Sequence, residues 1–87
     1  MRAVISVVGK DRVGILANVS NKCKDYNANI YDVSQTVLQD FFTMIMLVEL
    51  KSDNFLEFVD NLQDYGKEKN LKIHVMHEDI FNAMHTI

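Results

Sequence analysis

A short loop near the N-terminus holds the residues best suited to binding a charged small molecule. It has the sequence GKDRVG, from Gly9 to Gly14, and lies between an apolar β-branched run and a helical pattern. The chain therefore reaches a helix N-terminus, where the first backbone N–H groups have no partners within the helix. The helix dipole adds partial positive charge there, so the loop is suited to a carboxylate or another small anion.

Three side-chain properties of this loop favour binding. Arg12 can form a forked pair with a carboxylate, and Asp11 can accept a hydrogen bond from a ligand amino group or cap the helix. Gly14 has no side chain, so a ligand or a neighbouring backbone can approach it closely. The alternative is a structural turn, with Asp11 as a helix cap and Arg12 in a surface salt bridge. If the loop binds a ligand, the predicted contacts are Lys10, Asp11, Arg12, Val13, Gly14 and Ile15.

The chain offers little for catalysis or for metal binding. Ser20 and Ser34 have no histidine and acid at a spacing that indicates a catalytic triad. Cys23 falls on the apolar stripe of a predicted helix, which indicates a buried structural thiol. His74 and His77 are three residues apart along a predicted strand, so their side chains point to opposite faces. The third histidine is His85. We expect no enzyme activity, no metal site and no cofactor.

Length and charge narrow the function further. The 87 residues suffice for one domain, and the apolar share of 48% is that of a globular protein. The net charge is −3 and the pI about 5.4, without a block of like charges, so we expect no nucleic-acid or membrane partner. No apolar stretch approaches the ~20 residues that cross a bilayer. With one cysteine and no signal-peptide pattern, a cytoplasmic location is expected.

The hydrophobic periodicity predicts the elements that position the loop. Strands are expected over 3–8, 30–38, 41–50 and 71–75, and helices over the stretch between Gly14 and Asn27, over 55–65 and over 78–87. Asn54 and Glu57 fit a capping box at the start of the second helix. The strand over 41–50 is apolar on both faces, which predicts a central position covered on two sides.

This order predicts an α+β, ferredoxin-like βαββαβ sandwich as a single domain over residues 1–87, with a core over 2–77 and a C-terminal helix over 78–87. Right-handed crossovers give a four-stranded antiparallel sheet in the order 4-1-3-2, with both long helices on one face. The opposite face would expose one apolar row of the third strand. We expect the C-terminal helix, a second subunit, or both to cover it.

At this point the residues resemble a known family. The segment VVGKDRVGILANVS, followed by NANIYDVSQTVLQDFFTMIMLV, is similar to the ACT-domain pattern. In that pattern a strand leads through an Asp-Arg-x-Gly turn into a helix, and an Asn-Ile-x-Asp entry begins the second strand. The resemblance runs from Arg2 to about Val75. It is strongest for free-standing single-ACT-domain prokaryotic proteins and extends to the ACT halves of the glycine-cleavage transcriptional repressor. Family members often have proline where this chain has Val13.

The resemblance implies a regulatory, non-catalytic domain. In the family, amino acids bind where this loop of one subunit meets the second-strand region of its neighbour. The resemblance therefore adds Asn29, Ile30, Tyr31 and Asp32 as predicted contacts, with Asp32 suited to a ligand ammonium group. It also implies a homodimer paired along the second strands, which would remove an exposed strand edge. We expect an allosteric sensor of an amino acid or a related carboxylate.

Two other functions fit the same sequence. A protein–protein adaptor or dimerisation module would bind its partner through the open sheet face or the tail helix and would need no small ligand. A regulator like the glycine-cleavage repressor would act through another protein, because the acidic chain gives no basis for direct contact with DNA.

Overall fold

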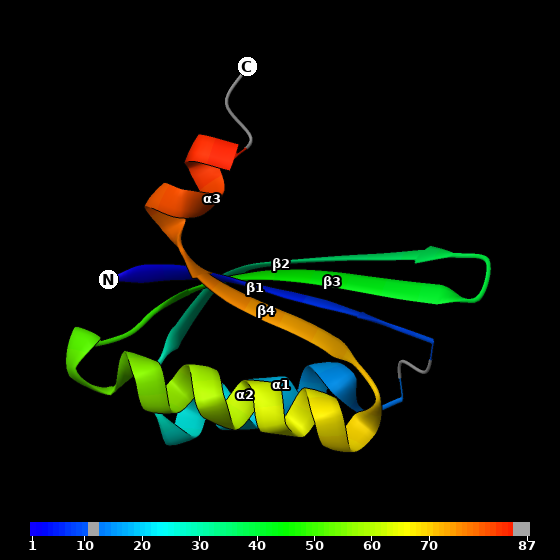
Figure 1. Ribbon diagram of the computed structural model, residues 1–87, viewed down its shortest axis with the longest axis horizontal. Helices are drawn as coiled ribbons and strands as arrows, with labels where there is room; N and C mark the ends of the chain where they lie inside the picture. Colours follow the sequence, from blue (N-terminus) through cyan, green and yellow to red (C-terminus); the bar gives the residue numbers. More distant parts are fainter. Residues whose placement is uncertain (11–12, 85–87) are drawn as a thin grey trace.

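The computed structural model describes residues 1–10 and 13–84, and the side chain of Ser52 is not among the described features. The elements follow in the order β1 (Arg2–Gly9), α1 (Ile15–Asp25), β2 (Asn29–Leu38), β3 (Phe41–Glu49), a 3-10 turn (Ser52–Asn54), α2 (Phe55–Lys69), β4 (Lys72–His77) and α3 (Glu78–Met84). This is the predicted βαββαβ order with an added C-terminal helix (Figure 1). The end of the predicted tail helix, 85–87, lies outside the described residues.

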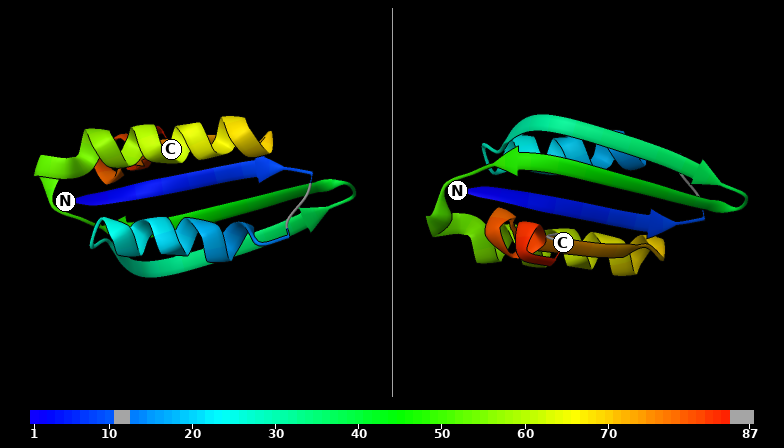
Figure 2. Two further views of the ribbon diagram at one scale, coloured as in Figure 1. Left: turned by 90° about the horizontal axis from the view of Figure 1, so that it is seen from below. Right: turned by 90° about the horizontal axis from the view of Figure 1, so that it is seen from above.

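The sheet has the strand order β2-β3-β1-β4, with every neighbouring pair antiparallel. This is the predicted order 4-1-3-2 read from the other edge, so the predicted fold class is confirmed. Helices α1 and α2 lie side by side on one face of the sheet, and α3 lies on the opposite face (Figures 1 and 2). β2 is an edge strand, and its pairing to β3 contains a bulge between Ile30 and Asp32.

The core fills the space between the sheet and the two long helices. Alternate residues of β1 and β3 point into it, as the two-residue period of a strand requires. One stripe of each helix faces them, with Val19 and Cys23 from α1 and Phe58 and Leu62 from α2 fully buried. The edge-to-face contact between Tyr26 and Phe58, with ring centroids 5.4 Å apart, closes one end of the core.

The second face of the sheet is covered only in part. Val4 on β1 is buried on this face, on the side of the sheet where α3 contacts β1 and β4. Beside β2 and β3 the same face stays open, so Phe41 is 52% and Ile45 39% exposed. The prediction that β3 is central is confirmed, whereas its cover on two sides is absent within the described protomer. The tail helix is too far toward β4 to reach the outer half of β3.

The predicted capping box at the start of α2 is wrong. Asn54 makes no side-chain hydrogen bond to the helix start; instead its Nδ2 donates to the carbonyl oxygen of Tyr26 at 3.5 Å. A 3-10 turn begins the helix in place of a box, which satisfies some end groups by tightening the chain. The side chain of Asn54 therefore ties the start of α2 to the end of α1, a long-range role that local spacing does not reveal.

Candidate functional site

The predicted loop joins the end of β1 to the start of α1. Gly14 is the N-cap of α1 and has a φ of 74°, a left-handed conformation that favours glycine. Its carbonyl oxygen accepts a hydrogen bond from the backbone N–H of Asn18 at 2.9 Å, which begins the helix. A Cβ at Gly14 would meet only the Asn18 side chain at 3.6 Å, so the backbone angle, rather than a crowded approach, requires glycine here.

The other predicted loop residues have different environments. Lys10 and Val13 are exposed, whereas Ile15 is 3% exposed and packs in the core. Ile15 therefore supports the helix start chiefly through packing. Asp11 and Arg12, the predicted amino-group and carboxylate contacts, lie outside the described residues.

The second set of predicted contacts lies at the opposite end of the sheet. Asn29 at the start of β2 stands opposite Glu49 of β3, which stands opposite Arg2 at the start of β1. The loop, by contrast, follows Gly9 at the other end of β1, where Phe42 and Val37 are the successive partners. Figure 1 shows both ends of the sheet in one view. One protomer thus keeps the two predicted halves of the site apart, separated by most of the length of β1.

Tyr31 belongs to a polar network at the start of β2. Its hydroxyl donates a hydrogen bond to Oε1 of Glu49 at 2.9 Å, and the Arg2 guanidinium lies 4.9 Å from the centre of its ring. Arg2 also approaches Glu49 at 4.0 Å and Glu78 of α3 at 3.7 Å. The hydrogen bond to Glu49, together with the negative charge of that carboxylate, raises the pKa of Tyr31. Tyr31 is thereby held on the open face, with α3 linked to the same network.

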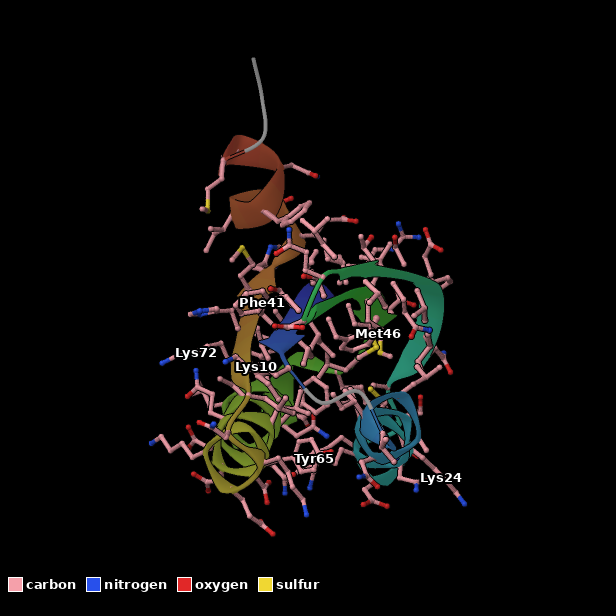
Figure 3. The ribbon with its side chains drawn as sticks, turned by 90° about the vertical axis from the view of Figure 1, so that its right-hand side faces the viewer. Lys10, Lys24, Phe41, Met46, Tyr65 and Lys72 are labelled. Carbon is pink, nitrogen blue, oxygen red and sulfur yellow. The ribbon has the colours of Figure 1, made fainter. Side chains whose placement is uncertain are left out.

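A hollow of about 450 Å³ lies beside the loop, between it and the β2–β3 hairpin. Figure 3 looks onto this end of the sheet and labels Lys10 and Phe41, whose ammonium and ring centre are 6.0 Å apart. Among the described lining residues, Lys10 is cationic and Asp40 is anionic. Its described lining consists of Lys10, Val13, Val37, Gln39, Asp40, Phe41 and Phe42.

The hairpin half of this hollow was not among the residues predicted from the sequence. Gln39 and Asp40 form the turn between the strands predicted over 30–38 and 41–50, and Gln39 adopts a φ of 55° there. The antiparallel strand order contained this information. Because the third strand runs opposite to β1, the hairpin that precedes it lies at the end of the sheet where β1 finishes. Any ligand beside Lys10 also meets that hairpin.

A second hollow, of about 390 Å³, lies at the other end of β2, near the end of α1. Its described lining consists of Ser20, Lys24, Asn27, Ala28, Asn29 and Ile30. It contains two of the predicted second-strand contacts, Asn29 and Ile30. The two hollows therefore lie at opposite ends of the same edge strand.

The outer edge of β2 has no neighbouring strand in the described chain. Every residue of β2 is exposed except Val33, which is half-buried. Apolar side chains are frequent along it, with Ile30 40%, Tyr31 51%, Val37 52% and Leu38 70% exposed. A long exposed edge of this composition is a template for pairing with another strand.

The described residues show no arrangement for metal binding or thiol chemistry. No group of three or more His, Cys, Asp or Glu side chains among them could hold a metal ion. His77 Nδ1 accepts a hydrogen bond from the backbone N–H of Asp79 at 3.0 Å, and His85 lies outside the described residues. Cys23 is 1% exposed, and burial raises the pKa of its thiol to about 11, as expected for a structural cysteine. Within the described chain, no helix is both long and apolar enough to span a membrane.

Comparison with known proteins gives consistent relatives over the whole chain. The family model of the ACT domain matches residues 2–76. A UPF0237 protein of Listeria innocua is 48% identical over 89 residues, which cover 100% of each chain. A UPF0237 protein of Methanopyrus kandleri is 44% identical over 88 residues, covering 99% of this chain and 98% of its own.

Solved structures agree with these relatives. An ACT domain protein from Streptococcus pneumoniae is 40% identical, covers 93% of each chain and has a TM-score of 0.82. A candidate glycine cleavage system transcriptional repressor is 27% identical with a TM-score of 0.75, covering 88% of this chain and 47% of its own. The regulatory subunit of aspartate kinase from Thermus thermophilus, 21% identical over 86% of this chain and 49% of its own, has a TM-score of 0.66 and shares the fold.

Proposed function

This chain belongs to the ACT-domain family, and from that premise we propose that it is a regulatory module that binds an amino-acid-like carboxylate between two copies of itself. The observation that carries the proposal is the exposed apolar edge of β2, which has one half of the predicted site at each end. Pairing two such edges would bury this edge and bring complementary halves together.

The geometry of such a pair follows from symmetry. Two antiparallel edge strands are related by a two-fold axis perpendicular to the sheet, and opposed side chains must lie on the same face. The axis therefore lies midway between two copies of the same residue. In the middle of β2 that residue is Val33 or Ser34. Once the bulge between Ile30 and Asp32 is counted, a centre on Val33 places the partner's Asn29 opposite Thr36, and a centre on Ser34 places it opposite Leu38. In both cases the start of the partner's β2 reaches the hollow beside Lys10.

The charges at this junction suit a zwitterion. Lys10 and the positive end of α1 favour a carboxylate, and Asp40 lines the same hollow. Asp32 of the partner subunit adds an acceptor for an ammonium group on the facing side. The apolar side chains of Val13, Val37 and Phe41 would contact the remainder of the ligand. Asp11 and Arg12 stay predicted contacts on the same loop.

Regulation would follow from mass action. A ligand that contacts both subunits binds the dimer and not the monomer, so it stabilises the assembly. By reciprocity, assembly raises the affinity for the ligand, and a protein that recognises the dimer senses the ligand concentration. The module needs no chemistry of its own for this role. We also propose a cytoplasmic location, because a single reduced cysteine suits that compartment.

Cysteine cross-linking tests the dimer and its register. We would introduce Val33→Cys and Ser34→Cys separately into a Cys23→Ser background. The residue next to the two-fold axis faces its own copy at a Cβ separation of about 5 Å. A small shift of the two strands brings such a pair within reach of a disulfide. We expect one of the two variants to cross-link under mild oxidation. Leu56→Cys, at a 77% exposed position on α2, is the control and should form no covalent dimer. Equal cross-linking of all three would contradict pairing along β2.

Ligand binding is tested with a panel of amino acids and related carboxylates in thermal-shift and calorimetric titrations. We expect one chemical class to raise the melting temperature and Lys10→Gln to abolish the response. Lys72→Gln on β4 removes the same charge from a residue that does not line the hollow and should leave the response unchanged. If Lys10→Gln and Lys72→Gln respond alike, the hollow beside the loop is not the ligand site.

The open half of the second sheet face favours one other function, that of a protein–protein adaptor. Phe41 and Ile45 are exposed there, and α3 presents Ile80 and Met84 to solvent at 56% and 66% exposure. An adaptor would dimerise or bind a protein while ignoring the whole ligand panel. Such a silent panel, combined with loss of a stoichiometric protein partner in Ile45→Lys, would favour the adaptor.

A further inference from the structure

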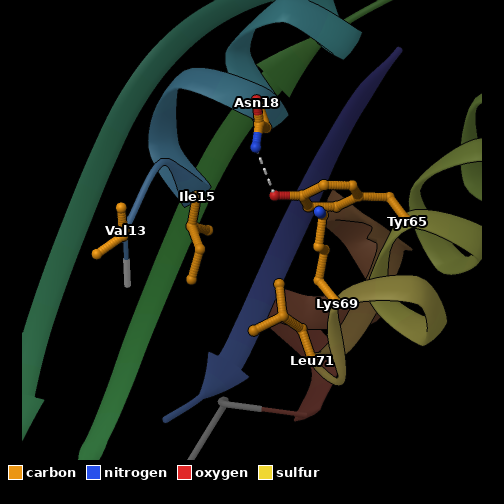
Figure 4. A pocket seen from close by; sticks show the side chains of 6 residues that line it. All are labelled: Val13, Ile15, Asn18, Tyr65, Lys69 and Leu71. Carbon is orange, nitrogen blue, oxygen red and sulfur yellow. Dashed lines mark hydrogen bonds between the residues drawn. The ribbon is translucent and has the colours of Figure 1, made fainter. Parts of the chain in front are cut away.

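A separate cleft of about 210 Å³ opens on the helical side of the molecule (Figure 4). It lies between the start of α1 and the end of α2, close to the start of β4. Its described lining consists of Val13, Ile15, Asn18, Tyr65, Lys69 and Leu71. Only Val13 is shared with the hollow beside Lys10, and the proposed role of the β2 edge does not involve this cleft.

Three polar side chains converge on the cleft from the two helices. Nδ2 of Asn18 donates a hydrogen bond to the hydroxyl oxygen of Tyr65 at 3.0 Å. Tyr65 is 7% exposed, and its hydroxyl proton has no acceptor among the described residues, so it remains available to a ligand. Lys69 extends from the last turn of α2 toward the same ring, as Figure 4 shows, and forms no ion pair with a described residue.

The charged side chains described at the cleft are cationic. The ammonium of Lys22, which does not line the cleft, lies 5.2 Å from the centre of the Tyr65 ring, so a second cation lies next to Tyr65. No acidic side chain lines the cleft in the described part of the chain. A carboxylate accepts several hydrogen bonds at once, which matches an ammonium, a hydroxyl and an amide that point to one place.

The rest of the described lining is aliphatic and comes from both sides of the cleft, with Leu71 beside Lys69 (Figure 4). Val13, Ile15 and Leu71 supply this aliphatic lining. The position of Leu71 is fixed by close packing, since a Cβ on Gly9 would collide with the Leu71 side chain and a Cβ on Gly66 would lie 3.0 Å from the Leu71 carbonyl oxygen. The backbone N–H of Leu71 also donates to the carbonyl oxygen of Gly66 at 2.7 Å. The Leu71 side of the lining is therefore preformed for a branched aliphatic group.

We propose that this cleft binds a short branched aliphatic monocarboxylate that lacks an α-amino group. Its carboxylate contacts Lys69, the Tyr65 hydroxyl and Asn18, and its aliphatic end contacts Ile15 and Leu71. A volume of about 210 Å³ holds roughly seven water-sized groups, close to the eight non-hydrogen atoms of a branched acid of six carbons. The whole cleft comes from one protomer, so a monomer binds this ligand as well as a dimer does.

The test is a titration of the ¹⁵N-labelled protein with 4-methylpentanoate and 4-methyl-2-oxopentanoate, with leucine as the amino-bearing analogue and acetate as the analogue without the aliphatic end. We expect saturable shifts at Asn18, Tyr65 and Leu71 for the first two acids, and at least about tenfold weaker binding of leucine and acetate. Lys69→Gln and Tyr65→Phe should each weaken binding about tenfold, the effect of one bond to a charged group. Lys69→Arg should keep most of the affinity.

Lys67→Gln is the matched control, because it removes the same charge from the same turn of α2 without lining the cleft. Lys69→Gln alters an exposed side chain, so a folded variant is assured even if Tyr65→Phe loses stability. The proposal is overturned by equal weakening in Lys67→Gln and Lys69→Gln, by the absence of saturable shifts, or by shifts confined to Lys10 and the hairpin. A negative result in this titration does not contradict the β2 dimer. If the protein is monomeric and still binds the acids, the cleft proposal is supported and the dimer proposal is not.

Discussion

A charge placed at the middle of β2 would measure both the existence and the register of the proposed dimer. Ser34 is exposed on the open face, so Ser34→Asp and Ser34→Lys are compatible with the folded protomer. If the two-fold axis passes through Ser34, each introduced side chain faces its own copy. If the axis passes through Val33, each introduced side chain faces Asp32 of the partner subunit, and the dimer contains two such pairs.

The size of the effect follows from the pair geometry. Opposed Cβ atoms are about 5 Å apart, and two unit charges at that distance interact by about 0.8 kcal/mol in water and about 3 kcal/mol at an effective dielectric constant of 20. The exposure of β2 favours the lower value. One like-charge pair then raises the dissociation constant of the dimer about fourfold, and two pairs raise it about fifteenfold. Ser34→Asp weakens the dimer in both registers, whereas Ser34→Lys weakens it only when the axis passes through Ser34.

Sedimentation velocity over a range of protein concentrations gives these dissociation constants. Gln63→Glu on α2 adds the same charge at an exposed position away from the edge and is the control. The difference between Ser34→Asp and the control should shrink in about 1 M salt, where the Debye length falls to about 3 Å. Identical dissociation constants for Ser34→Asp and Gln63→Glu at low salt would refute pairing along β2.

Three further predictions concern the protomer. Phe58→Ala should lose about 3–5 kcal/mol of unfolding free energy in urea, because Phe58 is fully buried at the centre of the core; a loss under 1 kcal/mol would contradict that position. Gly66→Ala should destabilise by about 1 kcal/mol despite better helix propensity, since the added Cβ meets the backbone oxygen of Leu71 and the side chain of Ile73; a more stable variant in the same assay would show that α2 can shift. For Cys23, the folded pKa of about 11 lies above the ordinary value of 9.0, so its contribution to stability is complete below pH 9 and is lost as pH rises toward 11. Cys23→Ala should remove that part of the pH dependence in melting experiments, and an unchanged profile would contradict the assignment.

Most of the fold could be predicted from local pattern. The alternation of apolar residues in β1 and β3 and the helical stripes of α1 and α2 fix the order of elements, and chirality then fixes the strand order. The errors arise where a contact joins distant segments. Asn54 was interpreted as a local cap, but its amide bonds to Tyr26 on another element. Cover for both faces of β3 was expected from its two apolar rows, but α3 follows β4 and contacts mainly β1 and β4; cover by a second subunit stays a prediction.

The candidate site, like the fold, was predicted only in part. The sequence placed Lys10 and Gly14 at a helix start, which the structure confirms, and the resemblance added the beginning of β2. Neither source indicated that Asp40 shares a hollow with Lys10, nor that Tyr65 and Lys69 meet Asn18 across the two helices. Those groupings depend on the register of the hairpin and on the packing of α2 against α1. Spacing along the chain does not encode either quantity.

Because the two halves of the proposed site come from different subunits, ligand binding should stabilise the dimer. A ligand present at 100 times its dissociation constant stabilises the state that binds it by about 2.7 kcal/mol per site. A symmetric dimer has two such sites, so the ligand favours assembly by about 5.4 kcal/mol in total. A shift of about 5.5 kcal/mol takes a two-state equilibrium from roughly 1:99 to 99:1. The protein should therefore change from mostly monomer to mostly dimer at fixed protein concentration, and dilution should weaken the apparent ligand affinity. A ligand affinity that stays constant across a hundredfold dilution through the dimer transition would show that one protomer suffices, and that the halves joined by β2 do not form one site.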